Sequence, residues 1–154
     1  MKIVPLMGQS PATRSVIDHF LAAPRLMRLG VTEPDGTPLV HPVWYTWEQG
    51  QFLLHIGTTS SKRTAIEAQP VVYCTIDDAG PGVFGVRGKA TATIDPDQQR
   101  VHTVVQAQCD RYTGLGDSEP RRFLMDMVAA GDLVLAVLTP RYLATWGLST
   151  WIKL

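Results

Sequence analysis

Residues 25–57, RLMRLGVTEPDGTPLVHPVWYTWEQGQFLLHIG, hold the hairpin pattern that decides the fold class. Apolar, strand-like runs occupy 25–33, 39–47 and 51–57. The first two are separated by PDGTP (34–38), in which proline sets φ and Asp-Gly suits the positive φ of a tight turn. EQG separates the second from the third and is another turn signal. Strands joined by such short turns pair antiparallel, so this stretch predicts an antiparallel sheet.

The rest of the chain supplies further strands and several helices. Apolar spacing, caps and breakers predict a helix over 13–23, a short helix ending at Pro70, strands over 71–77 and 82–94, helices over 96–112 and 119–130, and a strand over 132–148. The last strand is expected to be interrupted at Pro140, because proline cannot donate to a strand ladder. Six strands on 154 residues predict a mainly β, α+β fold, an antiparallel barrel with flanking helices.

Length and composition indicate one globular domain, over 13–154, preceded by a loose arm over 1–12 that is rich in proline, glycine and serine. Basic and acidic side chains number 14 each, so no charge excess favours a nucleic acid or a membrane surface. No leader opens the chain and no apolar run is long enough to span a bilayer, so we expect a soluble, cytoplasmic protein. Cys74 and Cys109 lie far apart and are expected to stay reduced.

The segment GTTSSKRTAIEAQP (57–70) places small and hydroxylated residues and one lysine at the start of a helix. A helix N-terminus presents unpaired N–H groups and the positive end of the helix dipole. Four hydroxyl side chains add donors, and Lys62 adds a full charge, so the segment predicts a seat for a phosphate group. The alternative is that Ser60 or Ser61 only caps the helix.

The segment HPVWYTW (41–47) contains a proline inside an apparent strand. Because Pro42 cannot donate to a ladder, the strand must be an edge strand or must open there. An opening beside aromatic side chains could accept a flat heterocycle, which free backbone groups can hydrogen-bond. The alternative is an aromatic core or dimer contact.

Four pieces in this order resemble the pyridoxamine 5′-phosphate oxidase-like flavin-binding split-barrel superfamily, which includes the deazaflavin (F420)-dependent reductases. They are LGVTEPDGTPLVHPVWYTW, FLLHIGTTSSKRTAIEAQPVVYCTID, VRGKATATI and VLTPRYLATWG, and the resemblance covers roughly residues 14–148. It implies a six-stranded split β-barrel that forms a homodimer, with two cofactors at the subunit interface. The expected cofactor is FMN, with F420 as the alternative.

The resemblance also implies roles for particular residues. Trp146 would approach the ring from the partner subunit, and 86–88 would border it. Many relatives carry an arginine just before the lysine, where this chain has serines, so one cationic anchor is expected here. The segment implied to line the ring is Pro42, Val43 and Trp44. The segment implied to hold the phosphate is Gly57, Thr58, Thr59, Ser60, Ser61 and Lys62.

The expected function is therefore that of an FMN-binding oxidoreductase with a small-molecule substrate and an electron donor. The cofactor would carry the redox chemistry, so no catalytic side chain is assigned. No histidine pair has metal-binding spacing, so no metal site is expected; a haem ligand, His41 or His55, remains an alternative. A non-catalytic cofactor-binding dimer is a second alternative. The polar, glycine-containing loop over 113–120 suits a lid over the site.

Overall fold

The computed structural model describes residues 1–5, 12–78 and 84–148. Its elements in chain order are β1 (Lys2–Pro5), α1 (Arg14–Ala22), β2 (Met27–Thr32), β3 (Pro38–Val43), β4 (Thr46–Glu48), β5 (Gln51–Gly57), α2 (Ser61–Ala68), β6 (Val71–Asp78), β7 (Phe84–Asp95), α3 (Gln98–Thr113), α4 (Glu119–Ala130) and β8 (Leu133–Trp146). Among these helices, none is both long and apolar enough to cross a membrane.

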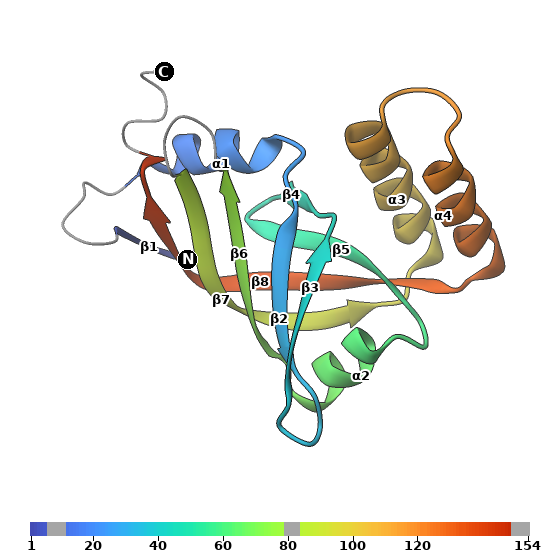
Figure 1. Ribbon diagram of the computed structural model, residues 1–154, viewed down its shortest axis with the longest axis horizontal. Coiled ribbons are helices and arrows are strands. Elements are labelled where there is room, and N and C mark those ends of the chain that lie inside the picture. The colour runs from blue at the N-terminus through green and yellow to red at the C-terminus, as the bar shows by residue number, and fades with distance from the viewer. Residues whose placement is uncertain (6–11, 79–83, 149–154) are drawn as a thin grey trace.

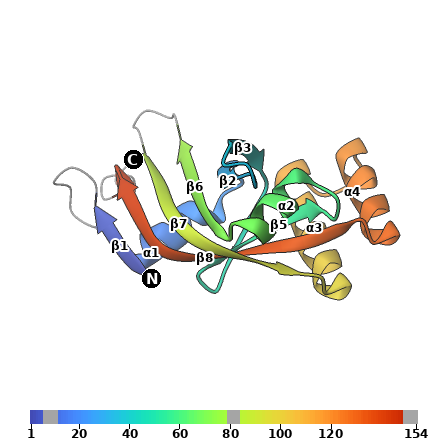
Figure 2. The ribbon, with the colours of Figure 1, turned by 90° about the horizontal axis from the view of Figure 1, so that it is seen from below.

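One eight-stranded sheet runs in the order β3-β2-β6-β7-β8-β5-β4, and β1 pairs with β8 beside this path. Of the pairings in the described residues, only that of β1 with β8 is parallel. The sheet curls, with α3 and α4 side by side at one end and α1 near the other, as Figure 1 and Figure 2 show. The prediction of an antiparallel α+β split barrel with flanking helices is confirmed.

The predicted strand over 39–47 is present but divided, which accounts for one of the strands beyond the expected six. β3 ends at Val43, and β4 begins at Thr46. Pro42 pairs with Arg28 of β2, and β3 is an edge strand of the sheet. Of the two alternatives that the proline left open, the edge position is therefore confirmed, since an edge strand has one side on which no ladder hydrogen bond is needed.

The N-terminal arm predicted over 1–12 is not loose throughout. Lys2–Pro5 forms β1 and pairs in parallel with Tyr142–Thr145 of β8. β8 pairs with β5 only over Leu133–Leu138, so its remaining edge offers backbone groups that β1 can satisfy. The prediction was wrong for these residues because it considered only local composition. Residues 6–11 lie outside the described residues.

The interruption predicted at Pro140 is also wrong, because β8 runs unbroken through it. Pro140 lies where β8 changes partner on one side, between the segment paired with β5 and the segment paired with β1. On the other side, the register with β7 shifts between Lys89 and Ala90, so that Arg141 has no counterpart. A proline is tolerated at such a β-bulge, where the ladder is already irregular.

β8 separates two apolar cores. Successive side chains of a strand point to opposite faces. Val134, Ala136 and Leu138 belong to the barrel core, whereas Leu133, Leu135 and Val137 pack with α3 on the other face. The second core also includes buried side chains of α3 and Leu53 of β5. The continuous apolar run LVLAVL thus follows from burial on both faces.

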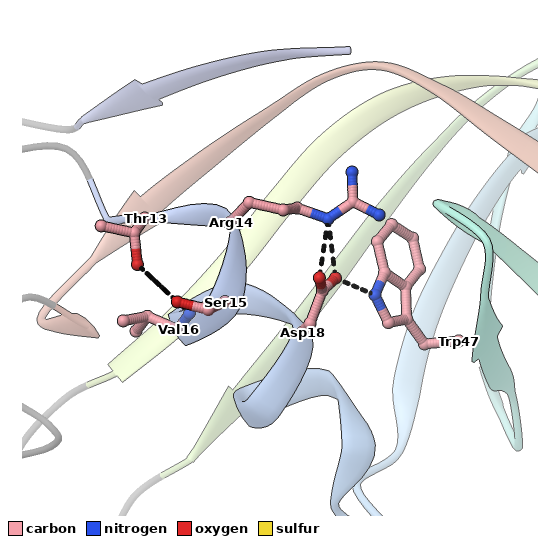
Figure 3. A network of polar contacts seen from close by, with 6 residues as sticks. All are labelled: Thr13, Arg14, Ser15, Val16, Asp18 and Trp47. Carbon is pink, nitrogen blue, oxygen red and sulfur yellow. Dashed lines mark hydrogen bonds and ion pairs between the residues drawn. The ribbon is translucent and has the colours of Figure 1, made fainter.

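The helix α1 is attached to β4 through Asp18 (Figure 3). The Nε1–H of Trp47 donates to Asp18 Oδ1 at 2.6 Å, and Arg14 Nε donates to the same carboxylate at 2.7 Å. The Arg14 guanidinium also lies 5.4 Å from the centre of the Trp47 ring. Phe20 and Leu21 of the same helix are fully buried in the barrel core, so α1 covers one opening of the barrel.

Gly88→Ala is expected to destabilise the protein. A β-carbon at Gly88 would overlap the carbonyl oxygen of Tyr142 on β8 and lie 2.7 Å from Leu143 Cδ2. Because the first of these atoms is backbone, the two strands must move apart, at a cost of about 1–3 kcal/mol in the free energy of unfolding. Denaturant unfolding measures this loss. Gly30→Ala, where the nearest atom would lie at 3.6 Å, is the control, and equal losses in both variants would contradict the explanation.

Candidate functional site

A cavity of about 430 Å³ lies where the ends of β3 and β5 and the start of α2 face α4. This volume falls within the range of small-molecule sites. The walls are mostly apolar, and a histidine and a lysine supply the ionisable groups. The lining residues are Pro42, Val43, Trp44, His55, Ile56, Gly57, Lys62, Pro120, Phe123, Leu124, Met127 and Leu133.

Both predicted binding segments contribute to this cavity. Pro42, Val43 and Trp44 of the expected ring segment line it, as do Gly57 and Lys62 of the expected phosphate segment. The two segments come from an edge strand and from a loop that follows the more central strand β5, so only the folded sheet places them together. The other predicted residues of the loop are not among the lining residues: Thr58, Thr59, Ser60 and Ser61.

The loop after β5 is held by backbone contacts and by a helix cap. The N–H of Thr58 donates to the carbonyl of Asp132 at 2.8 Å. Ser60 is the N-cap of α2, and its Oγ accepts the N–H of Arg63 at 3.3 Å. Of the two serines considered as caps, Ser60 is the one that caps the helix. The cap does not exclude a binding role, because it sets the first turn of α2, from which Lys62 reaches the cavity.

Lys62 is the cation of the cavity. It takes part in none of the ion pairs formed among the described residues. Its charge contributes to lowering the pKa of His41 and the pKa of His55, in each case after the larger effect of burial. A negatively charged group that enters the cavity therefore meets a positive charge that no protein carboxylate in the described residues neutralises.

Trp44 lies just beyond the end of β3 and is held by aromatic contacts. Its ring stacks on Tyr112 of α3, with ring centres 4.8 Å apart and planes within 3°. The Tyr112 hydroxyl donates to the carbonyl of Arg25 at 2.8 Å and accepts the N–H of Tyr45 at 3.3 Å. The division between β3 and β4 is thereby stabilised from α3, and Trp44 presents a flat wall to the cavity.

His55 of β5 contacts both this wall and α3. Its ring meets Trp44 edge to face, with centres 6.0 Å apart, and its Nδ1 lies 2.5 Å from Oε1 of Gln108. Gln108 is fully buried. Sequence reasoning considered His55 only as a haem ligand and did not identify Gln108. Their contact spans 53 positions of the chain, so no local spacing pattern could have indicated it.

The helix α4 forms the opposite wall, none of whose residues was assigned to the site from the sequence. Pro120, Phe123, Leu124 and Met127 line the cavity. Their spacing of three and four residues places them on one helical face, and this was the available signal. No residue of α4 is fully buried, and Phe123 keeps 62% of its surface exposed. An apolar face that the described residues cover only in part is suited to contact a bound molecule.

Ion pairs hold the connection between α3 and α4. Arg121 pairs with Asp110 of α3 and donates to the carbonyl of Gly114 at 3.1 Å. Gly114 and Gly116 have φ values of 79° and 112°, a region that glycine adopts readily. The loop over 113–120 is therefore held by ion pairs beside two glycines with positive φ, and its role as a lid stays a prediction.

Trp146 does not lie at this cavity within one chain. It packs over Gly85, so closely that a β-carbon there would overlap its ring. Leu133, at the opposite end of β8, lines the cavity, and a strand of this length spans roughly 40 Å at 3.3 Å per residue. Residues 86–88 of β7 pair with Leu143–Thr145 near Trp146 and are not among the lining residues. Contact of Trp146 or of residues 86–88 with a molecule in such a cavity would therefore require the cavity of a second subunit.

The described residues contain no group of three or more His, Cys, Asp or Glu that could hold a metal ion. The two candidate haem ligands differ in position. His55 lines the cavity, whereas His41 does not, and His41 Nε2 is buried without a hydrogen-bond partner among the described residues. Of the two, only His55 could therefore contact a molecule in the cavity.

The curled antiparallel sheet with its four helices is the architecture of a split barrel. The family model described as pyridoxamine 5′-phosphate oxidase matches residues 14–147, and the chain belongs to this family. Among curated proteins, no sequence matches this chain significantly.

Solved structures share the fold. A conserved hypothetical protein from Mycobacterium tuberculosis, Rv2991, is 23% identical, with a TM-score of 0.77 over 93% of this chain and 89% of that chain. An F420 reductase is 24% identical, with a TM-score of 0.67 over 82% and 94% of the two chains. HutZ, a haem storage protein from Vibrio cholerae, is 16% identical, with a TM-score of 0.64 over 83% and 89%.

The free energy of unfolding is expected to fall as the pH is lowered below about 6.5. Burial lowers the pKa of His41 and the pKa of His55 from the ordinary value of 6.5. Between about pH 6.5 and the two lowered pKa values, the unfolded chain therefore binds protons that the folded chain does not, and the free energy of unfolding falls. Below the two lowered pKa values both states are protonated, so the free energy of unfolding falls no further from this cause. Denaturant unfolding across this range measures the slope. The double variant His41→Gln/His55→Gln should give a flatter profile, and an unchanged slope would contradict the assignment.

Proposed function

We propose that this protein is an FMN-dependent oxidoreductase that binds the flavin in the cavity between β3, β5, α2 and α4. The observation that carries the proposal is the meeting of Lys62, which has no acidic partner among the described residues, with the aromatic wall at Trp44 in one cavity of about 430 Å³. A phosphorylated, flat, largely apolar molecule has the properties that these two features complement.

The residues present fit such a cofactor. Lys62 would hold the phosphate, and Val43 and Trp44, where the chain leaves β3, would lie along the ring. The bound flavin would exchange electrons with a donor and a small-molecule substrate. The chain's own contribution would be to bind and orient the ring and to exclude water, for which α4 supplies the apolar wall that includes Phe123 and Met127.

A homodimer and a cytoplasmic location belong to the same proposal. Trp146 lies far along β8 from the cavity of its own chain, so its expected contact with a cofactor would have to be made across a subunit interface. Val40 and Tyr73, on the two strands flanking β2, are exposed by 68% and 50% and would suit such an interface. Cys74 and Cys109 are buried and unpaired, as is usual in a reducing compartment.

F420 is the alternative cofactor, because the cavity features do not distinguish two phosphorylated ring systems and a structure similar in fold is an F420 reductase. A second alternative is a protein that binds its cofactor without turnover. HutZ, similar in fold, is a haem storage protein. The position of His55 on the cavity wall favours testing haem as well.

Addition of FMN to the purified protein is expected to give a bound-flavin absorption spectrum, because the cavity would remove the ring from water. Equilibrium titrations with FMN, F420 and haem, followed by chromatographic identification of the retained molecule, distinguish the candidates. Uptake of F420 alone would assign the deazaflavin branch. Reduction by a nicotinamide donor and reoxidation by an acceptor then test turnover. Uptake of none of the three would overturn the proposal.

Lys62→Ala is expected to weaken FMN binding by about tenfold to a hundredfold, since charge-assisted hydrogen bonds contribute about 1.5–3 kcal/mol. Isothermal titration of the purified variant measures the change. Arg100→Ala is the matched control, because it removes one positive charge from a surface ion pair with Asp95 and does not alter the cavity lining. If Lys62→Ala bound FMN as the unmodified protein does, the phosphate assignment would be wrong.

A further inference from the structure

The side-chain amide of Gln108 has only one orientation that the surrounding atoms allow. Gln108 projects from α3 and is fully buried. Its Nε2 lies 3.0 Å from the carbonyl oxygen of Leu53 and 3.2 Å from Thr46 Oγ1. A backbone carbonyl can only accept a hydrogen bond, so the amide nitrogen must face β5. The amide oxygen, Oε1, must then face His55.

This orientation determines the tautomer of His55. Gln108 Oε1 has no hydrogen to donate, so the Nδ1 of His55, 2.5 Å away, must carry the proton and donate it. Burial, and to a smaller extent the charge of Lys62, lowers the pKa of His55, whereas the hydrogen bond to Gln108 acts in the opposite direction. The ring is therefore neutral at neutral pH. A neutral ring with its proton on Nδ1 has a lone pair on Nε2.

The lone pair on Nε2 is available to a molecule in the cavity. Among the described residues, none forms a hydrogen bond with His55 Nε2, and His55 lines the cavity. Trp44 contacts the ring edge to face, and its indole N–H forms no hydrogen bond with His55 in the described structure. Lys62 acts on His55 through its charge without a hydrogen bond to it in the described structure. An acceptor in such a partly desolvated place favours a ligand that brings its own donor.

We propose that His55 positions the bound cofactor by accepting, at Nε2, a hydrogen bond from an O–H or N–H donor of that cofactor, and that Gln108 maintains the tautomer that makes this possible. The inference deepens the proposed function and rests on it. Besides an anionic group and a flat apolar surface, the cavity would then require a hydrogen-bond donor on the ligand. A flavin offers such donors on its ribityl chain and at the N–H of its pyrimidine ring.

The test compares affinities for FMN and for F420 in the full chain at pH about 8, where the phosphate monoester of FMN is a dianion. His55→Phe removes the acceptor and keeps a flat ring, whereas His55→Gln keeps an acceptor that does not titrate. His41→Phe is the matched control, because the pKa of His41 is also lowered by burial but His41 does not line the cavity. Thermal unfolding of each variant without cofactor reports any loss of folding.

We expect His55→Phe to weaken the binding of the cofactor about tenfold, the value of one hydrogen bond, and His55→Gln and His41→Phe to stay within about threefold of the unmodified protein. Nitrogen-15 NMR of the unmodified protein without cofactor should show a protonated Nδ1 and a bare Nε2 at His55. FMN methylated at the ring N–H locates the donor. If methylation weakens FMN binding to the unmodified protein but not to His55→Phe, the donor is the ring N–H. If methylation has equal effects on both proteins, the donor lies on the ribityl chain.

Unchanged affinity in His55→Phe, or the opposite tautomer in the NMR spectrum, would overturn this inference while leaving the proposed function in place. An equal loss of affinity in His55→Phe and His55→Gln, accompanied by equally lowered melting temperatures, would also overturn it, because His55 would then be a structural residue. Failure of the unmodified protein to bind FMN or F420 would overturn the proposed function and this inference together.

Discussion

The burial of β8 on both faces is the constraint on which the rest of the structure depends. Its alternate side chains enter the barrel core and the smaller core under α3. A strand that is apolar on both faces must be covered on both, so the sheet curls over one face and α3 packs on the other, with α4 beside it. The cavity lies at the margin of this second layer, where β8 begins at Leu133.

The edge strand β3 supplies the other boundary of the site. Pro42 limits pairing to one side, and the chain leaves the ladder after Val43. Trp44 then stacks on Tyr112, so the break in the sheet is filled by an aromatic pair rather than by another strand. An opening in a sheet that is stabilised by side chains of a separate helix provides backbone groups and a flat surface without destabilising the barrel.

The candidate site was predictable in part. Pro42 and Lys62 could be singled out because proline in a strand and a lysine at a helix start have direct physical consequences. Ser60 could be identified as a cap or a ligand, and the structure shows it as the cap of α2. The apolar face of α4 that includes Phe123 could be seen in the residue spacing, but its place at the cavity could not. That place, and the contact of His55 with Gln108, depend on how α3 packs against β5 and α4 against α3, which local patterns do not encode.

By itself, the amino-acid sequence determined the antiparallel pairing, the helices and the restricted pairing of the strand at Pro42, because turn residues, apolar periodicity and proline act within a few residues of where they stand. Only the tertiary structure decided that Lys2–Pro5 joins β8, that β8 continues through Pro140, and that the loop after β5 faces α4. These features depend on which backbone groups and apolar surfaces remain uncovered once the sheet has curled, and that is a property of the assembled chain.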